Sequence, residues 1–475
     1  MKRIVLLLFV FAGIVFTGCQ EEEVIPDPQN SVAFAHPEID LIGDNTTVSV
    51  AFADPAAYAG SITFSVTETG VAYGTDFTTS PEPVNHSITI PFEAGASSVS
   101  FLFSRLVKAY EGETKNVVFT ITGIDPQGIL IPDATRRVQV NFDETPVLSG
   151  EIAPEVGGPN VPNQVFVDLS SGTATAVART SWDLGFYGGD EFRVVLNGAT
   201  NMAAKQLNSN DLTQLVTVDD TVAVGEDTGS GIQNGNPAYV DGPDGSITHT
   251  AIAEVSANDG DNKVYLVNLG YKVSTILPNA GSVNAYGDAR GWIKIRVLRD
   301  GINYKLQYAN VDSTTFQEVS IEKKAAFNFT FFSFNTNAVV NVEPEKAKWD
   351  LNFTSFTDVA NLGSGLVSYA YQDFIVTNTK SGTRAYEVLN SAGISYEDFT
   401  LADVASANFD LAASIDQRAI GTKWRNDGSA SPDVKSDRFY ILKDGAGNVY
   451  KLRFTAITNA AGERGNPAFE YELLQ

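Results

Sequence analysis

The chain has 475 residues and a formal net charge of −25 at pH 7, with three histidines and one cysteine. Its length is enough for about three domains with separate cores, and its acidity argues against nucleic acid or anionic headgroups as partners. The few histidines leave little for a nucleophile and a base, so we expect no enzyme. Carboxylate pairs stay open, because 57 acidic residues produce chance pairs.

The first residues have the form of a secretory signal. Lys2 and Arg3 precede an apolar run over residues 4–16, which is too short to remain as a membrane span. Thr17-Gly18-Cys19 follows, and Cys19 is the only cysteine, so it cannot form an internal disulfide. We predict a signal peptide over residues 1–18 and an acidic, proline-containing tether over residues 19–30.

Phe16-Thr17-Gly18-Cys19 resembles the lipobox of bacterial lipoproteins. The resemblance implies cleavage before Cys19, acylation of that residue and attachment to the outer membrane. A secreted protein with a stray thiol is the alternative. The run Glu21-Glu22-Glu23 resembles the surface-export tag of Bacteroidetes lipoproteins, and a plain solvated tether is the alternative for it.

Residues 31–145 are predicted to form a β-sandwich. Short strand-like runs recur at sandwich spacing, at residues 47–52, 61–67, 87–91, 98–105, 116–122 and 136–142. In the run Ser98 to Phe103, apolar side chains occupy every second position and would share one buried face.

The same segment resembles a Calx-beta domain. The resemblance rests on Ala72-Tyr73-Gly74-Thr75-Asp76-Phe77, on the run from Ile88 to Gly95 and on Glu111-Gly112-Glu113. Some members of that family bind calcium through loop acids, which would here be Asp76, Glu111 and Glu113. Turn and cap roles are favoured for these acids, because no dense carboxylate cluster is visible.

After Pro146 a pattern occurs twice. Three landmarks appear in the same order in both copies: Phe166 to Gly172 and Phe332 to Asn337; the blocks Trp182-Asp183-Leu184-Gly185-Phe186 and Trp349-Asp350-Leu351-Asn352-Phe353; and the closing blocks Arg299 to Tyr308 and Lys443 to Phe454. The sequence therefore predicts two tandem modules, over residues 146–324 and 325–475.

Each closing block reads as a hairpin with Asp-Gly in the turn and aromatic residues at alternate positions of the returning strand. In the Trp-Asp-Leu blocks we expect Trp182, Leu184 and Phe186 on one strand face and Asp183 on the other. Core packing is the expected role of Trp182, Phe186 and their counterparts Trp349 and Phe353. Two short stretches, residues 210–215 and 400–405, look helical.

The doubled pattern resembles the HmuY family of haem-capturing lipoproteins, and the resemblance covers residues 146–475. It implies a mainly β fold, haem as ligand, and an outer-membrane haem receptor as a partner. Haem iron takes axial donors such as His, Met, Cys or Tyr. Because His36 and His86 lie outside the resemblance, Met202 and His249 are the candidate axial ligands, each with an ordinary structural role as the alternative.

The second module has no His, Met or Cys after residue 325. Tyr369, Tyr371 and Tyr386 are its weak candidates, and a degenerate copy without ligand is the simpler interpretation. No metal other than haem iron is expected. The rival function is a structural or adhesive surface protein that binds a glycan or a protein. Overall we expect an all-β chain with few short helices.

Overall fold

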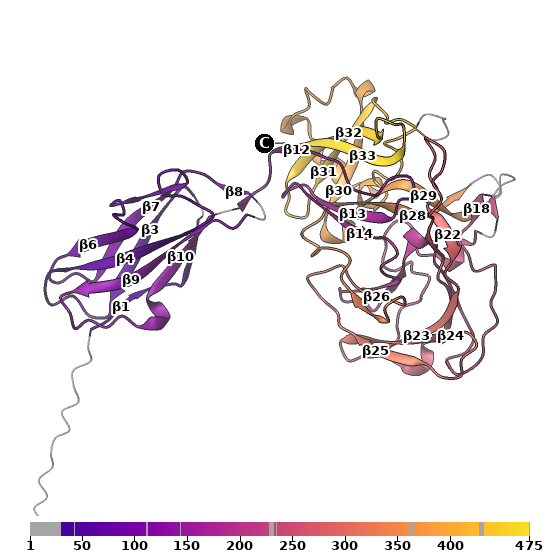
Figure 1. Ribbon diagram of the computed structural model, residues 1–475, viewed down its shortest axis with the longest axis horizontal. Helices are drawn as coiled ribbons and strands as arrows, with labels where there is room; N and C mark the ends of the chain where they lie inside the picture. Colours follow the sequence, from indigo (N-terminus) through magenta and orange to yellow (C-terminus); the bar gives the residue numbers. More distant parts are fainter. Residues whose placement is uncertain are drawn as a thin grey trace, which may run out of the picture. The chain divides into compact units, whose positions relative to one another are not determined.

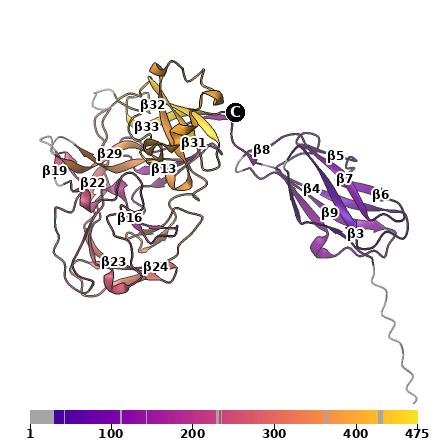
Figure 2. The same ribbon diagram turned by 180° about the vertical axis from the view of Figure 1, so that it is seen from behind.

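The computed structural model describes residues 30–41, 43–110, 113–142, 144–227, 232–233, 235–361, 365–426 and 432–474. The chain divides into two compact units (Figures 1 and 2). One runs to Glu144 with an interruption at Tyr110–Gly112, and the other runs from Thr145 to Gln475. The regular secondary structure of both is almost entirely β-strand, which confirms the expected all-β class.

The first unit is a sandwich of two sheets. One sheet has the order β1 (Val32–Phe34), β3 (Asn45–Phe52), β7 (Ser98–Arg105), β5 (Phe77–Ser80); the other has the order β2 (Glu38–Asp40), β10 (Arg137–Asn141), β9 (Asn116–Asp125), β4 (Gly60–Thr69), β6 (Ser87–Phe92). A 3-10 turn, η1 (Asp133–Thr135), precedes β10, and β8 (Ala109–Tyr110) pairs with β11 (Glu144–Thr145).

All six strand runs predicted in this segment form strands. Strand β7 alternates as expected, with Val99, Phe101 and Phe103 buried between exposed neighbours. The alternation works because successive side chains of a strand point to opposite faces, so that one face joins the core between the sheets. Phe101 and Phe103 both contact Phe119 of β9 across that core.

The second unit contains four larger sheets. Their strand orders are β12 (Ser149–Ile152), β33 (Arg464–Leu473), β32 (Val449–Thr458), β31 (Arg438–Lys443), β30 (Arg384–Leu389); β14 (Thr173–Ala178), β13 (Asn163–Asp168), β28 (Leu351–Asn361), β29 (Leu366–Thr377); β16 (Val194–Leu196), β15 (Leu184–Tyr187), β26 (Phe329–Ser333), β27 (Ala338–Val340); and β17 (Ala203–Gln206), β20 (Tyr265–Asn268), β23 (Trp292–Asp300), β24 (Asn303–Asn310), β25 (Gln317–Ile321).

Short elements complete the second unit. Two small ribbons pair β18 (Glu226–Asp227) with β19 (Ile232–Gln233) and β21 (Tyr271–Val273) with β22 (Tyr286–Ala289). The 3-10 turns are η2 (Gly198–Thr200), η3 (Pro237–Tyr239), η4 (Asp259–Asp261), η5 (Thr379–Ser381), η6 (Asn390–Ala392), η7 (Leu401–Asp403) and η8 (Ser406–Asp410). Among the described residues a single four-residue α-helix, α1 (Ala412–Ile415), is present.

The two sequence repeats exchange strands. Strand β13 of the first repeat pairs with β28 of the second, with Val167 opposite Leu351. In the equivalent place β15 of the first repeat pairs with β26 of the second, with Leu184 opposite Phe332. The Trp-Asp-Leu strand of each repeat is therefore completed by the opening strand of the other, and residues 145–475 form one compact unit.

The buried aspartates of the two blocks bond in the same way. Asp183 accepts a hydrogen bond from the backbone N–H of Phe334 at 2.6 Å, and Asp350 accepts one from the N–H of Leu169 at 3.0 Å. Each bond runs from one repeat to the other, so the pseudo-symmetry of the sequence is also a symmetry of contacts.

The expected face assignment in the Trp-Asp-Leu block is wrong for Trp182. Leu184 and Phe186 do lie in one core, but Trp182 lies in a separate aromatic cluster with Trp349. The regular strand begins only at Leu184, so the alternation does not extend to Trp182. Asp183 is also fully buried, and an ion pair of 2.6 Å with Arg290 compensates its charge.

Of the two predicted helical stretches, residues 210–215 form no helix. The carboxylate of Asp211 instead accepts hydrogen bonds from the N–H and hydroxyl of Thr213, at 2.9 and 2.7 Å, which closes a turn. The second stretch contains only the single turn η7. Asp403 caps that turn by accepting from the N–H of Thr400 at 2.9 Å.

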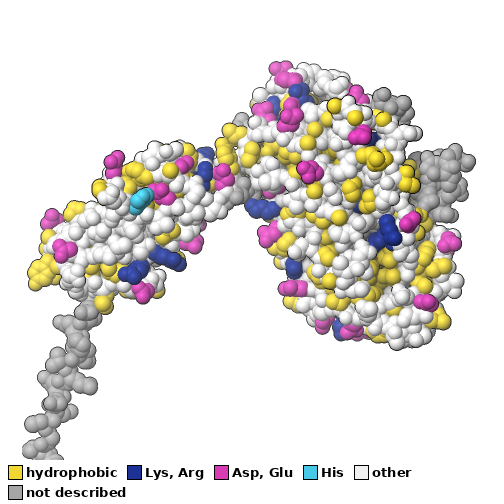
Figure 3. All heavy atoms as spheres, in the orientation of Figure 1, with side chains coloured by type: hydrophobic (Ala, Val, Ile, Leu, Met, Phe, Trp, Pro, Cys, Tyr) yellow, Lys and Arg dark blue, Asp and Glu magenta, His cyan; other side chains and the backbone are white. Residues whose placement is uncertain are grey.

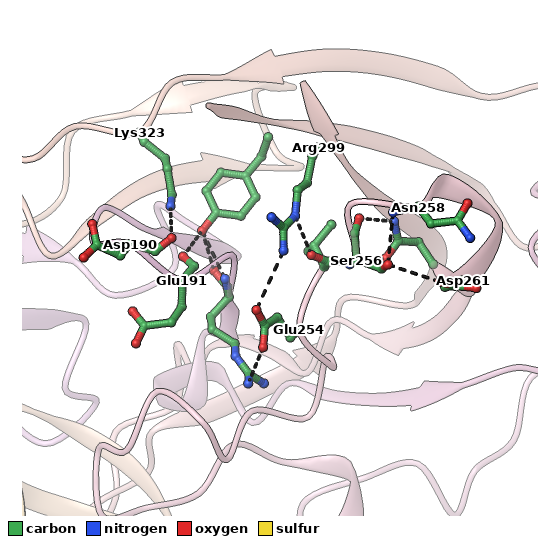
Figure 4. A network of polar contacts seen from close by, with 12 residues as sticks. Asp190, Glu191, Glu254, Ser256, Asn258, Asp261, Arg299 and Lys323 are labelled. Atoms are coloured by element: carbon green, nitrogen blue, oxygen red, sulfur yellow. Dashed lines mark hydrogen bonds and ion pairs between the residues drawn. The ribbon is translucent and has the colours of Figure 1, made fainter. Parts of the chain in front are cut away.

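Both closing hairpins form as predicted, β23 with β24 and β31 with β32. Tyr304 of the first is fully buried, and its hydroxyl accepts from the N–H of Arg193 at 3.1 Å and donates to the carbonyl of Tyr187 at 2.9 Å. Figure 4 shows Asp190, Glu191 and Lys323 at one end of the polar network around this hydroxyl and Ser256, Asn258 and Asp261 at the other. The hairpin aromatic thus ties surface loops to the sheet.

Candidate functional site

Two pockets with room for a small molecule lie among the described residues of the second unit. The first, which we call the seam pocket, has a volume of about 190 Å³ and is lined by both repeats. Its walls are the faces of two strand-exchanged sheets. On β13 and β28, Val165, Val167 and Leu351 face an apolar core, whereas the alternating positions Gln164, Phe166, Asn352, Thr354 and Phe356 line the pocket.

Two pairs of aromatic side chains line the seam pocket. Trp349 contacts Phe166 edge-to-face at 5.0 Å between ring centroids, and Trp182 contacts Phe331 in the same manner at 4.7 Å. Each pair joins the tryptophan of one repeat to the phenylalanine of the other. Both tryptophans are buried, as expected for packing residues, and both also line the pocket.

Several buried polar atoms of the pocket lining have no hydrogen-bond partner in the described structure. They are the indole nitrogens of Trp182 and Trp349, Nε2 of Gln164, Oδ1 of Asn352 and Oγ1 of Thr377. Buried polar groups are normally paired, and each exception carries a cost of about 1–3 kcal/mol. All five atoms belong to residues that line this one pocket.

Three ionisable side chains stand at the seam pocket. Burial raises the pKa of Glu343 to about 7 and that of Asp241 to about 6. Both are held by backbone N–H groups, Glu343 by that of Phe329 at 2.7 Å and Asp241 by those of Leu196 and Ala251. The ammonium group of Lys380 donates to the carbonyl of Gly245 at 3.1 Å, and burial lowers its pKa.

The second pocket, which we call the Trp292 pocket, is larger, at about 770 Å³. It lies along the start of β23 and the end of β24 and includes rings of Trp292, Tyr308, Phe316 and Phe334. The lining also includes amide and cationic side chains: Lys272, Arg290, Asn310, Gln317, Asn335 and Asn337. Arg290 is already paired with the buried Asp183, so Lys272 is the more available cation.

The predicted axial ligands occupy different environments. Met202 is 1% exposed, packs in the core of the first hairpin sheet and lines the seam pocket. The side chain of His249 is 68% exposed, with Nδ1 3.8 Å from a carboxylate oxygen of Asp244. Its neighbours Ile247 and Thr250 line the seam pocket. Joint ligation of iron by the two side chains stays a prediction.

The tyrosine candidates of the second repeat line neither pocket. Tyr369 and Tyr371 lie together on β29, with ring centroids 5.2 Å apart. Tyr386 lies on β30, is 9% exposed and accepts a hydrogen bond from the N–H of Ala405 at 3.2 Å. These positions agree with packing roles, which were the alternative for tyrosines in such strands.

The candidate acids of the first unit are only partly described. Asp76 accepts a hydrogen bond from the N–H of Ala72 at 2.8 Å, the turn role favoured for it. Glu113 lies 3.2 Å from Lys115, while Glu111 and Cys19 lie outside the described residues. In the part of the chain that the structure describes, no group of three His, Cys, Asp or Glu side chains could hold a metal ion, and no helix is long and apolar enough to cross a membrane.

Sequence reasoning missed Gln164, Asn352, Glu343 and Lys380. The first two carry a signal that alternation could have revealed, because each is a polar residue between two apolar neighbours or next to one within its strand. Glu343 and Lys380 carry no such signal, because only the exchange of strands brings them to one pocket.

The fold thus defines the larger unit as a duplicated all-β scaffold with two pockets. The chain belongs to the HmuY family: the model of that family, described as HmuY protein, matches residues 160–315 and 325–471, more than half of the chain. The two matched segments fit the expected pair of HmuY-like modules.

Other comparisons add little. Among solved structures, the apo-form Calx CBD1 domain matches at 13% identity over 24% of this chain and 99% of its own, with a TM-score of 0.20. A two-domain protein of unknown function from Bacteroides fragilis matches at 10% identity over 64% of this chain and 91% of its own, also with a TM-score of 0.20. Such scores carry no argument, so the Calx-beta resemblance stays a prediction. Curated proteins yielded no match.

Proposed function

We propose that this protein is a lipid-anchored, surface-exposed outer-membrane protein that binds haem and catalyses no reaction. The observation that carries the proposal is its membership of the HmuY family through two matched segments. The signal-like start and Cys19 support an anchor at the cell envelope. Delivery of haem to an outer-membrane receptor is part of the same proposal.

The Trp292 pocket is the better place for the macrocycle. Its volume of about 770 Å³ falls within the range of roughly 300–1,000 Å³ typical of ligand pockets. Aromatic rings offer contacts to a flat ligand, and Lys272 offers a cation for a carboxylate of the ligand. The seam pocket, at about 190 Å³, is too small for a porphyrin without movement of its walls.

The lining of the Trp292 pocket suits the porphyrin better than its iron. It contains no His, Met or Cys. The hydroxyl of Tyr308 donates to Gln317 at 2.7 Å, and burial raises the pKa of this tyrosine, which disfavours the phenolate as an iron ligand. Haem would therefore be held there mainly by its rings and carboxylates.

Titration of residues 19–475 with haemin and with iron-free protoporphyrin, followed by absorbance, tests the proposal. We expect one site per chain and affinities within about threefold for the two compounds, because the iron adds little. Lys272→Ala should weaken both about tenfold, as loss of a charged contact does. His249→Ala serves as the control and should leave both unchanged.

Different outcomes would change the assignment. Strong preference for haemin, lost in Met202→Ala or His249→Ala, would move the site to the predicted axial pair. Two haemins per chain would show that the second repeat also binds.

Absence of any haemin binding would favour the adhesive alternative. That alternative has one supporting observation, the amide-rich lining of the Trp292 pocket around the half-exposed ring of Phe316, which also suits a glycan.

A further inference from the structure

The seam pocket has a chemistry of its own, separate from the proposed haem site. Engineered cavities of about 150 Å³ with apolar walls take up benzene, so a pocket of about 190 Å³ has room for one ring and a small substituent. The rings of Trp182, Trp349, Phe166 and Phe331 supply flat apolar walls for such a ring.

The unpartnered atoms specify the substituent. Gln164, Trp182 and Trp349 are 3, 9 and 7% exposed, and each presents an N–H group without a partner. The nearby Oδ1 of Asn352 is an acceptor without a partner. A ligand that satisfies this set needs a carbonyl oxygen to accept from the N–H donors and an N–H of its own to donate to Asn352.

The charges at the pocket favour a neutral ligand. Lys380 is the one cation among the pocket-lining residues, and it faces Glu343, Asp241 and Asp244. An anionic ligand would have to share that cation with these acids and lose its hydration, which is costly in an apolar pocket. A neutral ligand avoids this cost.

We propose that the seam pocket binds a small, neutral aromatic molecule that carries an amide or lactam group, with its ring between the aromatic walls and its polar group on Gln164, Asn352 and the two indoles. Both repeats contribute to the site: Gln164 and Trp182 come from the first, and Asn352 and Trp349 from the second. Strand exchange is what brings the four side chains together.

Benzamide is a suitable probe, compared with benzoate and toluene by calorimetry and thermal shift on residues 19–475. Benzamide should bind at least about tenfold more tightly than either, since benzoate adds a charge and toluene lacks the polar group. Equal binding of toluene would show that the polar atoms are unused, tighter benzoate would show that the site is anionic, and no benzamide binding would show that only water occupies it. Each of these three results overturns the proposal.

Substitutions that keep the side-chain volume test whether benzamide binds in the seam pocket. Gln164→Met and Asn352→Leu each remove a side-chain amide while nearly keeping the side-chain volume, and each should weaken benzamide about tenfold. Gln317→Met, the same type of change in the Trp292 pocket, should have no effect. Unchanged affinity in both seam variants would overturn the assignment, and the comparison of probes on the unmodified chain remains decisive if a variant does not fold.

Discussion

Asp183 and Asp350 occupy equivalent positions in the two repeats, but the burial of their carboxyl groups is compensated by different partners. Asp183 has the ion pair with Arg290 in addition to its backbone bond. Asp350 is held by hydrogen bonds from Leu169 N–H and from the hydroxyl of Thr383, at 3.0 and 3.2 Å. Burial, followed by repulsion from Asp168 and Asp444, raises the pKa of Asp350 to about 8. Burial raises the pKa of both carboxyl groups, but only Asp183 has a cation beside it.

Asp350 should make the protein less stable as pH rises. An aspartate in the unfolded chain has a pKa of about 3.9, so between about pH 4 and pH 8 the folded state holds a proton that the unfolded state has lost. The free energy of unfolding therefore falls with rising pH across this window, by at most about 1.4 kcal/mol per pH unit from this group.

Asp350→Asn should flatten that dependence. The amide imitates the protonated acid: its oxygen can accept from Leu169 and its NH₂ group can donate to Thr383. Urea unfolding at pH 5 and pH 8 would measure the effect, and an unchanged pH slope would contradict it. Asp183→Asn is the matched control; it leaves Arg290 without its carboxylate and should destabilise the protein at both pH values.

At the level of elements, Gly270 allows the turn between β20 and β21 to approach the backbone of η2 closely. Its φ is +66°, and a Cβ atom there would lie 1.8 Å from the carbonyl oxygen of Thr200. Gly291, just before β23, also has a positive φ of +93°, but a Cβ atom there would meet nothing within 4 Å. The two glycines share a conformation and differ only in the space around them.

Gly291→Ala should cost about 1–2 kcal/mol, the usual penalty for a left-handed conformation. Gly270→Ala should cost clearly more, because the backbone of Thr200 must also move, and this shift would disturb the neighbouring Met202. Equilibrium unfolding of both variants gives the comparison. Equal destabilisation would mean that the contact with Thr200 relaxes freely.

At the level of the whole molecule, strand exchange makes the two repeats interdependent. Strands β13 and β15 of the first repeat complete sheets with β28 and β26 of the second. The cohesion of the second unit therefore depends on these shared sheets and on its cores.

Acidic side chains are scattered over the face of the molecule in Figure 3, with Lys and Arg among them, so the net charge is not gathered into one patch on that face.

The second unit alone, residues 145–475, cut between Lys324 and Ala325 tests this interdependence without a contribution from the sandwich. Each fragment alone would expose unpaired strands and half of the aromatic cluster that contains Trp182 and Trp349, so we expect neither fragment to unfold cooperatively. The two fragments expressed together should form a one-to-one complex that unfolds in one transition. Cooperative unfolding of either isolated fragment, followed by circular dichroism, would show that the repeats fold as separate modules.

Much of the organisation could be predicted from the sequence, because it depends on local patterns. Strand-like runs placed six strands of the first unit, although not β1, β2 or β5, and the repeated landmarks indicated the duplication that the family match supports. The Asp-Gly turns and alternate aromatics predicted both closing hairpins. Such features depend on neighbours along the chain. The two-residue repeat of a strand therefore appears directly as alternation in the sequence.

Only the tertiary structure decided which repeat completes which sheet, and so which side chains meet. Gln164 and Asn352 are 188 positions apart in the sequence yet line one pocket, and Trp182 leaves the core of Leu184 for a cluster with Trp349. Either partner would satisfy the same backbone hydrogen bonds and bury similar apolar side chains, so no local pattern distinguishes pairing within a repeat from pairing between repeats.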